Sequence, residues 1–266
     1  MSEVVLSQLY CYPVKSLAGT ALSQSLLEPF GLQHDRRWMV VDERSGDFIS
    51  QRTHPRMALI QVEHCQQRIV LREAGGHTLQ VTLPDDKRLR QVTVWGDQCQ
   101  SWDAGDEAAR WLSELLQTEC RLVYFPDNEI RQVDPNYAEP GDKTAFSDGF
   151  PLLLISQGSL DDLNSRLAEP VEMMRFRPNL VVSGCEPFAE DNWKKIRIGE
   201  IILRIVKPCS RCNMPNVNLQ TGQREKEPMR TLSQYRRRDN QVFFGQNVIA
   251  EGVGEITVGM PVEIIE

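Results

Sequence analysis

The first third of the chain is a series of short strand-like segments, and this pattern constrains the fold more than any other feature of the sequence. Runs rich in Val, Ile, Leu and Thr are separated by turn-forming residues such as Ser45-Gly46-Asp47 and Gly75-Gly76. The predicted strands cover residues 4–12, 38–42, 59–63, 68–71, 79–83 and 90–94. Many short strands at this spacing are typical of a β-barrel or β-sandwich. We therefore expect the chain to begin with a β domain.

Helices are predicted at two places in the rest of the chain. Apolar residues recur at helical spacing over residues 106–117, where Asp106 is the expected N-cap. Ser159 and Asp162 form a variant of the capping box and predict a helix that continues to residue 167. Residues 127–148 are polar, contain Pro and Gly, and predict a long surface loop. Further strands are predicted at residues 121–124, 151–156, 179–183, 198–206, 256–258 and 262–265.

The length and composition fit a globular protein of one large or two ordinary domains. The chain has 266 residues, of which 41% are hydrophobic and 25% are charged, so it can bury a sizeable core. No Gly/Ser linker separates its halves. We expect a mainly β fold with some α, in which a β domain at residues 1–122 packs closely on a second β domain at residues 123–266.

Charge and cysteine usage narrow the partners and the compartment. The net charge of −7 argues against a general nucleic-acid binder, because such a protein needs a basic surface. Residues 1–10 lack the pattern of a signal peptide, and no run of about 18 apolar residues is present, so no membrane contact is predicted. The seven cysteines show no disulfide framework, which favours a reducing compartment. We therefore predict a soluble, cytoplasmic protein.

The segment Lys207-Pro-Cys209-Ser-Arg211-Cys212-Asn places two thiols at the end of a predicted β-hairpin. The proline before the first thiol should stop the strand from continuing in register. Loops on a rigid scaffold often carry reacting groups, so this loop is a candidate site. One thiol, activated by Arg211, would suit a soft metal. The alternative for either cysteine is buried packing.

Two other interpretations of the Cys-x-x-Cys pair lack support. A structural zinc site needs two further ligands, usually a second cysteine pair or spaced histidines. The histidines lack that spacing; they are His34, His54, His64 and His77. A thioredoxin-like pair should open a helix in a βαβ unit, whereas the neighbourhood of Cys209 predicts strands.

Basic residues with polar neighbours occur at three other strand ends. Lys15 precedes Ser16, Arg36 precedes a strand, and Arg177 lies two residues before Asn179. A guanidinium matches the geometry of an oxyanion, so the joint occurrence predicts a site for a phosphate or a polar heterocycle. Each basic residue taken singly is more commonly a surface charge. The run Arg236-Arg237-Arg238 is expected to be a solvated helix end, with docking of an acidic electron-transfer partner as an alternative.

Six motifs together resemble those of MOSC proteins that have an N-terminal β-barrel domain. They are Tyr12-Pro-Val-Lys-Ser-x-x-Gly19, Asp35-Arg-Arg-Trp38, Phe146-Ser-Asp148, Phe176-Arg-Pro-Asn179, Cys209-Ser-Arg-Cys212 and Phe244-Gly-Gln-Asn247. This family includes the mitochondrial amidoxime-reducing components and the bacterial YcbX-type reductases of N-hydroxylated purines. The resemblance extends over residues 4–265 and implies an N-terminal MOSC β-barrel domain packed on a MOSC β-barrel domain.

The resemblance also implies a molybdenum cofactor, a pterin dithiolene with a phosphate, held between the two domains. Cys212 would be the catalytic thiolate and the ligand of molybdenum, while Cys209 would be structural. The remaining site residues implied by the resemblance are Lys15, Ser16, Arg36, Asp148, Arg177 and Asn179 around the phosphate and pterin, Ser210 and Arg211 beside the thiolate, and Asn247 near the cofactor. Such a cofactor would supply the redox chemistry, and the protein would supply binding and electrostatics.

The implied activity is two-electron reduction of N-hydroxylated compounds, namely N-hydroxylated purines, amidoximes and hydroxylamines, in detoxification. The chain has no ferredoxin cluster signature, so a separate electron donor is expected, ferredoxin-like or a flavin reductase. The alternatives from other classes are a non-catalytic cofactor carrier or sulfur-transfer module, and a zinc-stabilised interaction module. Pyridoxal phosphate binding is a further suggestion of the resemblance.

Overall fold

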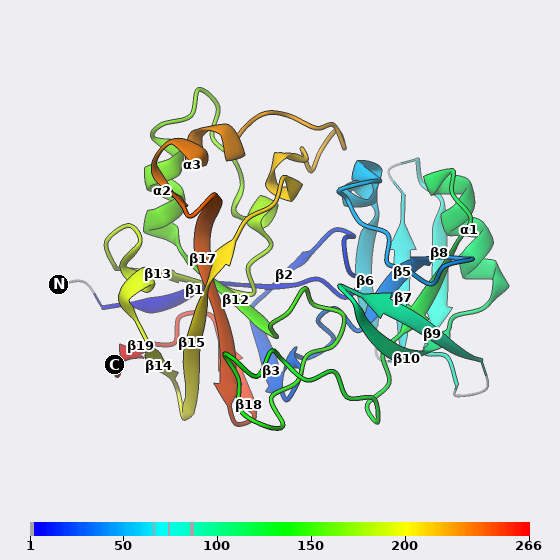
Figure 1. The fold of residues 1–266 in the computed structure, drawn as a ribbon, viewed down its shortest axis with the longest axis horizontal. Coiled ribbons are helices and arrows are strands. Elements are labelled where there is room, and N and C mark those ends of the chain that lie inside the picture. Colours follow the sequence, from blue (N-terminus) through cyan, green and yellow to red (C-terminus); the bar gives the residue numbers. More distant parts are fainter. Residues whose placement is uncertain (1–2, 66, 74, 86–87) are drawn as a thin grey trace.

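The computed structural model describes residues 3–65, 67–73, 75–85 and 88–266. Two lobes are visible, with both chain ends on the far side of one of them (Figure 1). The first lobe, on the right of Figure 1, contains the segments between residues 38 and 124. The second lobe, on the left, contains most of the later segments. Most of the elements are strands, so the predicted mainly β fold with some α is confirmed.

The second lobe is built on a large sheet that takes strands from both ends of the chain. Its order within the described residues is β19-β14-β15-β17-β12-β13-β1-β2, and β16 pairs with β17. The strands are β1 (Val5–Cys11), β2 (Thr20–Leu22), β12 (Leu152–Ser156), β13 (Leu180–Ser183), β14 (Lys195–Ile198), β15 (Ile201–Ser210), β16 (Arg237–Arg238), β17 (Gln241–Glu251) and β19 (Val262–Ile264). The chain therefore starts in the second lobe before it enters the first.

Two helices and three short 3-10 turns accompany this sheet, with a small sheet below it. They are α2 (Gln157–Asn164), α3 (Met229–Tyr235), η2 (Met173–Phe176), η3 (Ala189–Asn192) and η4 (Met214–Asn216). The small sheet pairs β18 (Gly254–Thr257) with β3 (Gln24–Glu28), and β3 with β4 (Gly31–Leu32). The core of this lobe buries alternate apolar residues of its strands, including Leu180, Val182 and Leu203.

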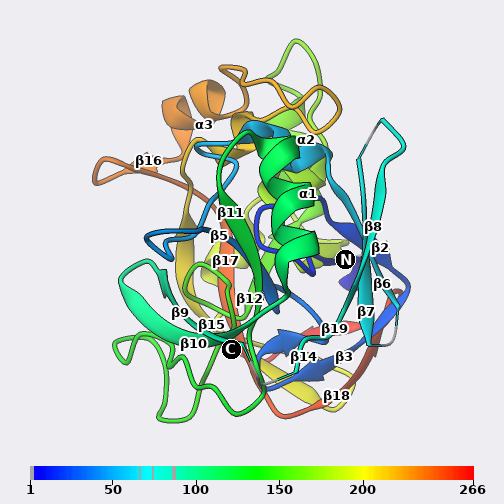
Figure 2. The same cartoon turned by 90° about the vertical axis from the view of Figure 1, so that its right-hand side faces the viewer.

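The first lobe contains two further sheets covered by one helix. Its elements are β5 (Trp38–Asp42), η1 (Pro55–Leu59), β6 (Gln61–Cys65), β7 (Arg68–Arg72), β8 (Thr78–Thr82), β9 (Leu89–Val94), β10 (Asp97–Asp103), α1 (Asp106–Leu116) and β11 (Cys120–Tyr124). The sheet orders are β5-β11-β10-β9 and β6-β7-β8. Helix α1 lies on the outer side of the lobe (Figure 2) and buries Leu112 and Leu116 against the core. This packing agrees with the apolar face predicted for the helix.

The structure corrects the expected starts of two helices. The N-cap of α1 is Gly105 rather than Asp106, which is the first helical residue and accepts a 2.7 Å hydrogen bond from Arg121. The N-cap of α2 is Ser156, whose hydroxyl accepts from the backbone N–H of Ser159. The predicted capping box at Ser159 was therefore wrong by three residues, because the preceding strand β12 leads directly into the helix.

Three smaller expectations also differ from the structure. Leu59 ends η1, so the predicted strand starts later, at Gln61. Strand β15 continues through Pro208 to Ser210, but its register against β17 shifts on both sides of the proline. The expected solvated helix end is met in part: Arg236 is the C-cap of α3 but pairs with Asp191 at 2.6 Å, and the exposed Arg237 and Arg238 form β16.

The division of the chain into domains at residues 1–122 and 123–266 stays a prediction. Strands β1 and β2 precede that division, yet β1 pairs with β13 of the second lobe. After β1, the backbone N–H of Lys15 donates a 2.7 Å hydrogen bond to the carbonyl of Trp38, the first residue of β5 in the first lobe. The chain between these points therefore lies where the two lobes meet.

Candidate functional site

The segment that follows β1 is held in place by the backbone of residues 36–38. Arg36 N–H donates to the carbonyl of Tyr12 at 2.9 Å, and Trp38 N–H donates to that of Pro13 at 3.0 Å. Gly19 allows the chain to return close to Tyr12, because a Cβ at this position would lie 2.3 Å from the tyrosine ring. Two of the predicted basic strand ends are thus fixed against each other by backbone hydrogen bonds.

Three of the predicted site residues have a left-handed backbone conformation. The φ angles are 67° at Ser16, 48° at Arg36 and 57° at Arg177. Non-glycine residues adopt such angles at a cost of ~1–3 kcal/mol each, and they concentrate at functional sites, where the surroundings fix them. These backbone conformations therefore lower the stability of the fold, and they fix the directions of the three side chains.

Arg36 and Arg177 both stack on the buried ring of Tyr12. The guanidinium carbons lie 4.4 Å and 4.1 Å from the ring centroid. Arg36 Nη1 pairs with the carboxylate of Asp35 at 2.5 Å, and its Nη2 donates to the carbonyl of Arg177 at 3.1 Å. Asp35 in turn accepts from the backbone N–H of Tyr12 at 2.8 Å. The positive charge of Arg36 is therefore compensated within the fold.

Arg177 differs from Arg36 because it is buried without a counter-ion. Its Nη1 donates to the carbonyl of Leu17 at 2.7 Å, whereas its Nη2 is buried and has no hydrogen-bond partner. Within the described parts of the chain, no carboxylate forms an ion pair with Arg177. Burial, together with the charge of Arg36, lowers the pKa of Arg177 to about 10. A buried, unpaired cation of this kind indicates that an anion belongs at the site.

Lys15 is also buried, but it has one carboxylate partner. Its Nζ lies 2.5 Å from the carboxylate of Asp148 and donates to the carbonyl of Phe146 at 2.7 Å. Burial lowers the pKa of Lys15 to about 8, although Asp148 acts in the opposite direction. Asp148 is exposed and also accepts a 3.0 Å hydrogen bond from the indole of Trp95. Lys15 is thus a cation whose charge is only partly stabilised.

The two predicted asparagines serve mainly the scaffold. The side-chain amide of Asn179 donates to the carbonyl of Tyr10, and its oxygen accepts from Arg36 and from the backbone of Leu153. Asn179 therefore joins β1, β12 and Arg36, and positions the guanidinium. Asn247 on β17 donates to the carbonyl of Lys207 at 3.2 Å and so supports the strand that leads to the thiols.

The thiol loop begins where β15 ends. Cys209 is half-buried, Cys212 is exposed, and both are free thiols. Arg211 donates to the sulfur of Cys209 at 3.2 Å and to the carbonyl of Phe176 at 2.6 Å. The guanidinium thus contacts Cys209, the thiol predicted to be structural, rather than the predicted metal ligand. Cys212 is left accessible to a bound metal.

All of the predicted site residues line one narrow pocket of about 120 Å³ between the lobes. They are Lys15, Ser16, Arg36, Asp148, Arg177, Asn179, Ser210, Arg211, Cys212 and Asn247. Four of them, Asp148 and the three residues from Ser210 to Cys212, also line a wider neighbouring cavity of about 1080 Å³. Residues that lie far apart in the sequence therefore line one continuous site.

The residues present fit an anionic, sulfur-ligated cofactor. The unpaired Nη2 of Arg177 and the partly stabilised Lys15 fit a phosphate or a polar heterocycle. The accessible thiol of Cys212 fits a soft metal at the point where the pocket meets the wider cavity. Among the described residues, no three His, Cys, Asp or Glu side chains are grouped to hold a metal ion by themselves.

Three residues at the site were missed by the sequence reasoning. Tyr12 was quoted only as part of a motif, but its ring supports both buried guanidiniums. Arg52 and Trp95 line the wider cavity and stack on each other, with the guanidinium 4.1 Å from the ring. A strand-end tyrosine gives some indication of such a role, whereas Arg52 and Trp95 come from separate loops with no local pattern that would single them out.

Comparisons with known proteins identify both parts of the chain. A model of the MOSC N-terminal beta barrel domain matches residues 3–119, and a model of the MOSC domain matches residues 141–263. Mitochondrial amidoxime-reducing component 1 of Mus musculus is 36% identical over 97% of this chain and 82% of its own length. The human protein of that name is 34% identical over the same shares. A molybdenum cofactor sulfurase of Oryza sativa is 33% identical over 97% of this chain but only 34% of its own length.

The comparisons contradict the predicted cytoplasmic location. The amidoxime-reducing relatives from mouse, frog, human and rat are all named as mitochondrial proteins. The prediction was wrong because it rested on cysteine usage and on the first ten residues, neither of which identifies a compartment. No helix in the described ranges is long and apolar enough to cross a membrane.

Nothing in the comparisons supports pyridoxal phosphate binding or detoxification. The chain belongs to the MOSC family of proteins with an N-terminal MOSC β-barrel domain, the family of the mitochondrial amidoxime-reducing components.

Proposed function

We propose that this protein is a molybdenum-cofactor-dependent reductase of N-hydroxylated compounds. The observation that carries the proposal is the convergence of all predicted site residues on one pocket, in which Arg177 is buried without a counter-ion. Relatives named for amidoxime reduction match nearly the whole chain and support the same function. The substrates proposed are N-hydroxylated purines, amidoximes and hydroxylamines.

The residues of the pocket would divide the work of holding the cofactor. Lys15, Arg36 and Arg177 would bind its phosphate and the polar edge of the pterin, because all three residues line the same pocket. Cys212 would hold the metal through its thiolate. Asn179 positions Arg36 through a 3.1 Å hydrogen bond and does not itself need to touch the cofactor.

A bound molybdenum cofactor would supply the two-electron chemistry that cleaves the N–O bond. Each hydroxylamine or amidoxime takes up two electrons and two protons, and yields the amine or amidine and one water. The electrons would come from a separate donor protein, ferredoxin-like or a flavin reductase. The thiol loop lies beside the wider cavity, so substrate would reach the reacting atoms from that side.

A cofactor-carrier or sulfur-transfer module is the second candidate. The exposed Cys212 favours it, because an accessible thiol could also carry sulfur, and the rice sulfurase relative matches nearly the whole chain. A carrier would bind the cofactor but would not turn over N-hydroxylated compounds. Reduction of benzamidoxime by the loaded protein with a chemical reductant separates the two candidates.

The decisive experiment measures molybdenum and pterin in protein from a host that makes the cofactor. Wild type should contain about one molybdenum per chain, Cys212→Ala should lose the metal, and Arg36→Ala should lose both metal and pterin. The matched control is Cys209→Ala, which changes the other thiol of the loop and should retain the cofactor. A Cys212→Ser variant with full activity, or a wild type without molybdenum, would contradict the proposal.

A further inference from the structure

The wider cavity beside the thiol loop has an excess of positive charge, although the whole chain carries −7. Its charged lining consists of the cations Arg52, Arg211, Arg224, Lys226 and Arg230 and the carboxylates Asp148 and Glu225. Counted by formal charge, five cations and two carboxylates leave +3 at this surface. Clefts lined by one sign of charge concentrate ligands of the opposite sign.

The two carboxylates of this lining are already engaged by cations outside it. Asp148 pairs with Lys15 at 2.5 Å, and Glu225 forms an ion pair with Arg175 and accepts from Asn218 at 2.8 Å. Arg230 alone of the cavity cations has a carboxylate partner among the described residues, namely Glu227 at 2.8 Å. The positive charge of the lining is therefore not neutralised from within the cavity.

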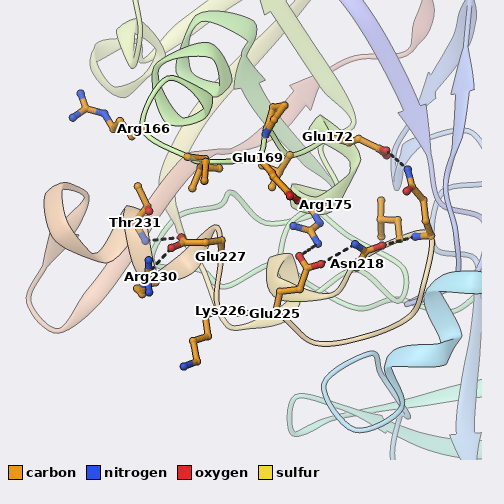
Figure 3. Close-up of a pocket in the computed structure, with 16 residues that line it drawn as sticks. Arg166, Glu169, Glu172, Arg175, Asn218, Glu225, Lys226, Glu227, Arg230 and Thr231 are labelled. Carbon is orange, nitrogen blue, oxygen red and sulfur yellow. Dashed lines mark hydrogen bonds and ion pairs between the residues drawn. The ribbon is translucent and has the colours of Figure 1, made fainter.

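The adjacent cavity in Figure 3 differs, because its lining contains four cations and four carboxylates and so carries no formal excess charge. It measures about 620 Å³, and within it Arg175 faces Glu225 while Arg230 faces Glu227. Figure 3 also shows that Lys226 points away from both of these ion pairs. Lys226 and Arg230 line both cavities, but only the wider one has an excess of cations over carboxylates.

A second, independent observation comes from Arg52 and Trp95. The Nη2 atom of Arg52 is buried and has no hydrogen-bond partner. Its guanidinium stacks on Trp95, which lines the cavity with half of its surface exposed. Arg224 reaches across from the other lobe and donates to the backbone carbonyl of Arg52. A buried donor without a partner and an exposed aromatic ring together indicate a planar ligand with an acidic group.

We propose that the wider cavity selects N-hydroxylated substrates that are anionic, with a planar ring placed at Trp95 and a carboxylate or phosphate bound by Arg52, Arg224 and Lys226. The inference rests on the proposed reductase function, because it names the substrate class of the same site. The N-hydroxyl group would then lie toward Cys212, which lines the same cavity.

The test compares benzamidoxime with its 4-carboxylate and 4-phosphonate derivatives on molybdenum-loaded enzyme, with a chemical reductant as electron donor. The anionic substrates should have kcat/KM values about tenfold higher than the neutral one, because charged hydrogen bonds contribute that much to binding. Salt should reduce this advantage. The two derivatives distinguish a carboxylate from a phosphate preference.

The double variant Arg224→Gln/Lys226→Gln should reduce the advantage of the anionic substrates to about twofold or less. Its matched control is Arg44→Gln/Lys194→Gln, which removes the same charge at exposed ion pairs with Glu119 and Glu266 and should leave all three rates unchanged. Lys226→Gln alone serves if loss of the Arg224 contact to Arg52 disturbs the lobes. An equal loss for neutral and anionic substrates, seen only with a protein donor, would identify a donor-docking surface and overturn the inference.

A binding measurement separates failure of this inference from failure of the proposed function. Calorimetry with the non-reducible amides benzamide and 4-carboxybenzamide should give about tenfold tighter binding of the carboxylate to wild type, and no difference in the double variant. Equal binding of the two amides would overturn the inference even if amidoximes are reduced. Tighter binding of the carboxylate without any reduction would uphold the anion site and overturn the reductase function.

Discussion

Arg121 and Arg177 are two largely buried arginines with opposite surroundings. In the first lobe, Arg121 contacts three carboxylates: Asp103 at 2.5 Å, Asp106 at 2.7 Å and Glu43 at 3.0 Å. Hydrogen bonding to Asp103 raises the pKa of Arg121. Between the lobes, Arg177 has no carboxylate partner in the described chain, and burial lowers its pKa to about 10. The charge of the first arginine is balanced within the fold, whereas the second has no balancing carboxylate among the described residues.

This difference shows why burial and charge alone do not identify a site. Arg121 lies in β11 and Arg177 precedes β13, and both side chains are shielded from water. The distinguishing property is the balance of charge around them, because a buried ion pair is self-contained while a buried lone cation costs free energy. Variants that remove one arginine or the other should therefore affect different properties.

The largest effect is expected from Arg121→Met. Asp103 is buried and, among the described residues, would keep Arg90, at 3.1 Å, as its one ion-pair partner, beside a 2.8 Å hydrogen bond from the backbone N–H of Gly105. Removing one member of a buried pair should lower the free energy of unfolding by about 3 kcal/mol. Urea denaturation measures the change, and Arg44→Met is the matched control because its pair with Glu119 is exposed and should cost less than about 1 kcal/mol. Equal losses in both variants would mean that the network around Asp103 contributes little.

Arg177→Met should show the reverse pattern. Its removal relieves an unpaired buried charge and loses one hydrogen bond to Leu17, so the unfolding free energy of the cofactor-free protein should change by no more than about 1 kcal/mol. Cofactor affinity should fall by about 30-fold, because a charged hydrogen bond to the ligand is lost. Molybdenum content after gel filtration and urea denaturation measure the two quantities. A loss of stability as large as that of Arg121→Met would make Arg177 a structural residue.

Local patterns predicted most of the fold. The run at Trp38–Asp42 became β5 with the predicted bounds, and the helix at residues 106–117 differs from α1 by one residue. Short strands such as β2 and β4 exist only because a partner strand is present, so no local pattern could reveal them. The start of α2 was misplaced for a related reason, because its cap depends on the end of β12.

The sequence predicted which residues line the candidate site, but not how these residues contact one another. The six motifs named residues that line one pocket, although they come from β15, from β17 and from the loops that follow β1 and precede β5, β12 and β13. The contact of Arg211 with Cys209 and the unpaired Nη2 of Arg177 depend on how the lobes pack. Tertiary contacts of this kind leave no spacing in the sequence, so the balance of charge at the site could be seen only in the structure.

The buried charge of Lys15 is balanced less completely than that of Arg121 and more completely than that of Arg177, because Asp148 is its one carboxylate partner in the described chain. The pH dependence of stability tests this balance directly, and its expected effect is the smallest of the three. Its pKa is about 8 in the fold because of burial, against about 10.4 in an unfolded chain. Between these values the unfolded chain holds a proton that the folded chain has released, so the unfolding free energy should rise with pH. Below about pH 8 both states are protonated and the cost of burying the charge is constant. The expected gain from pH 8 to 9.5 is about 1–2 kcal/mol for the cofactor-free wild type relative to Lys15→Met. Urea denaturation across this range measures it.

Asp148→Asn should start the rise at lower pH, because it removes the only carboxylate that pairs with Lys15 in the described chain. A bound anionic cofactor should abolish the rise, since it stabilises the ammonium. A flat difference in the cofactor-free protein would show that Asp148 balances the charge of Lys15, and Lys15 would then resemble Arg121 rather than Arg177.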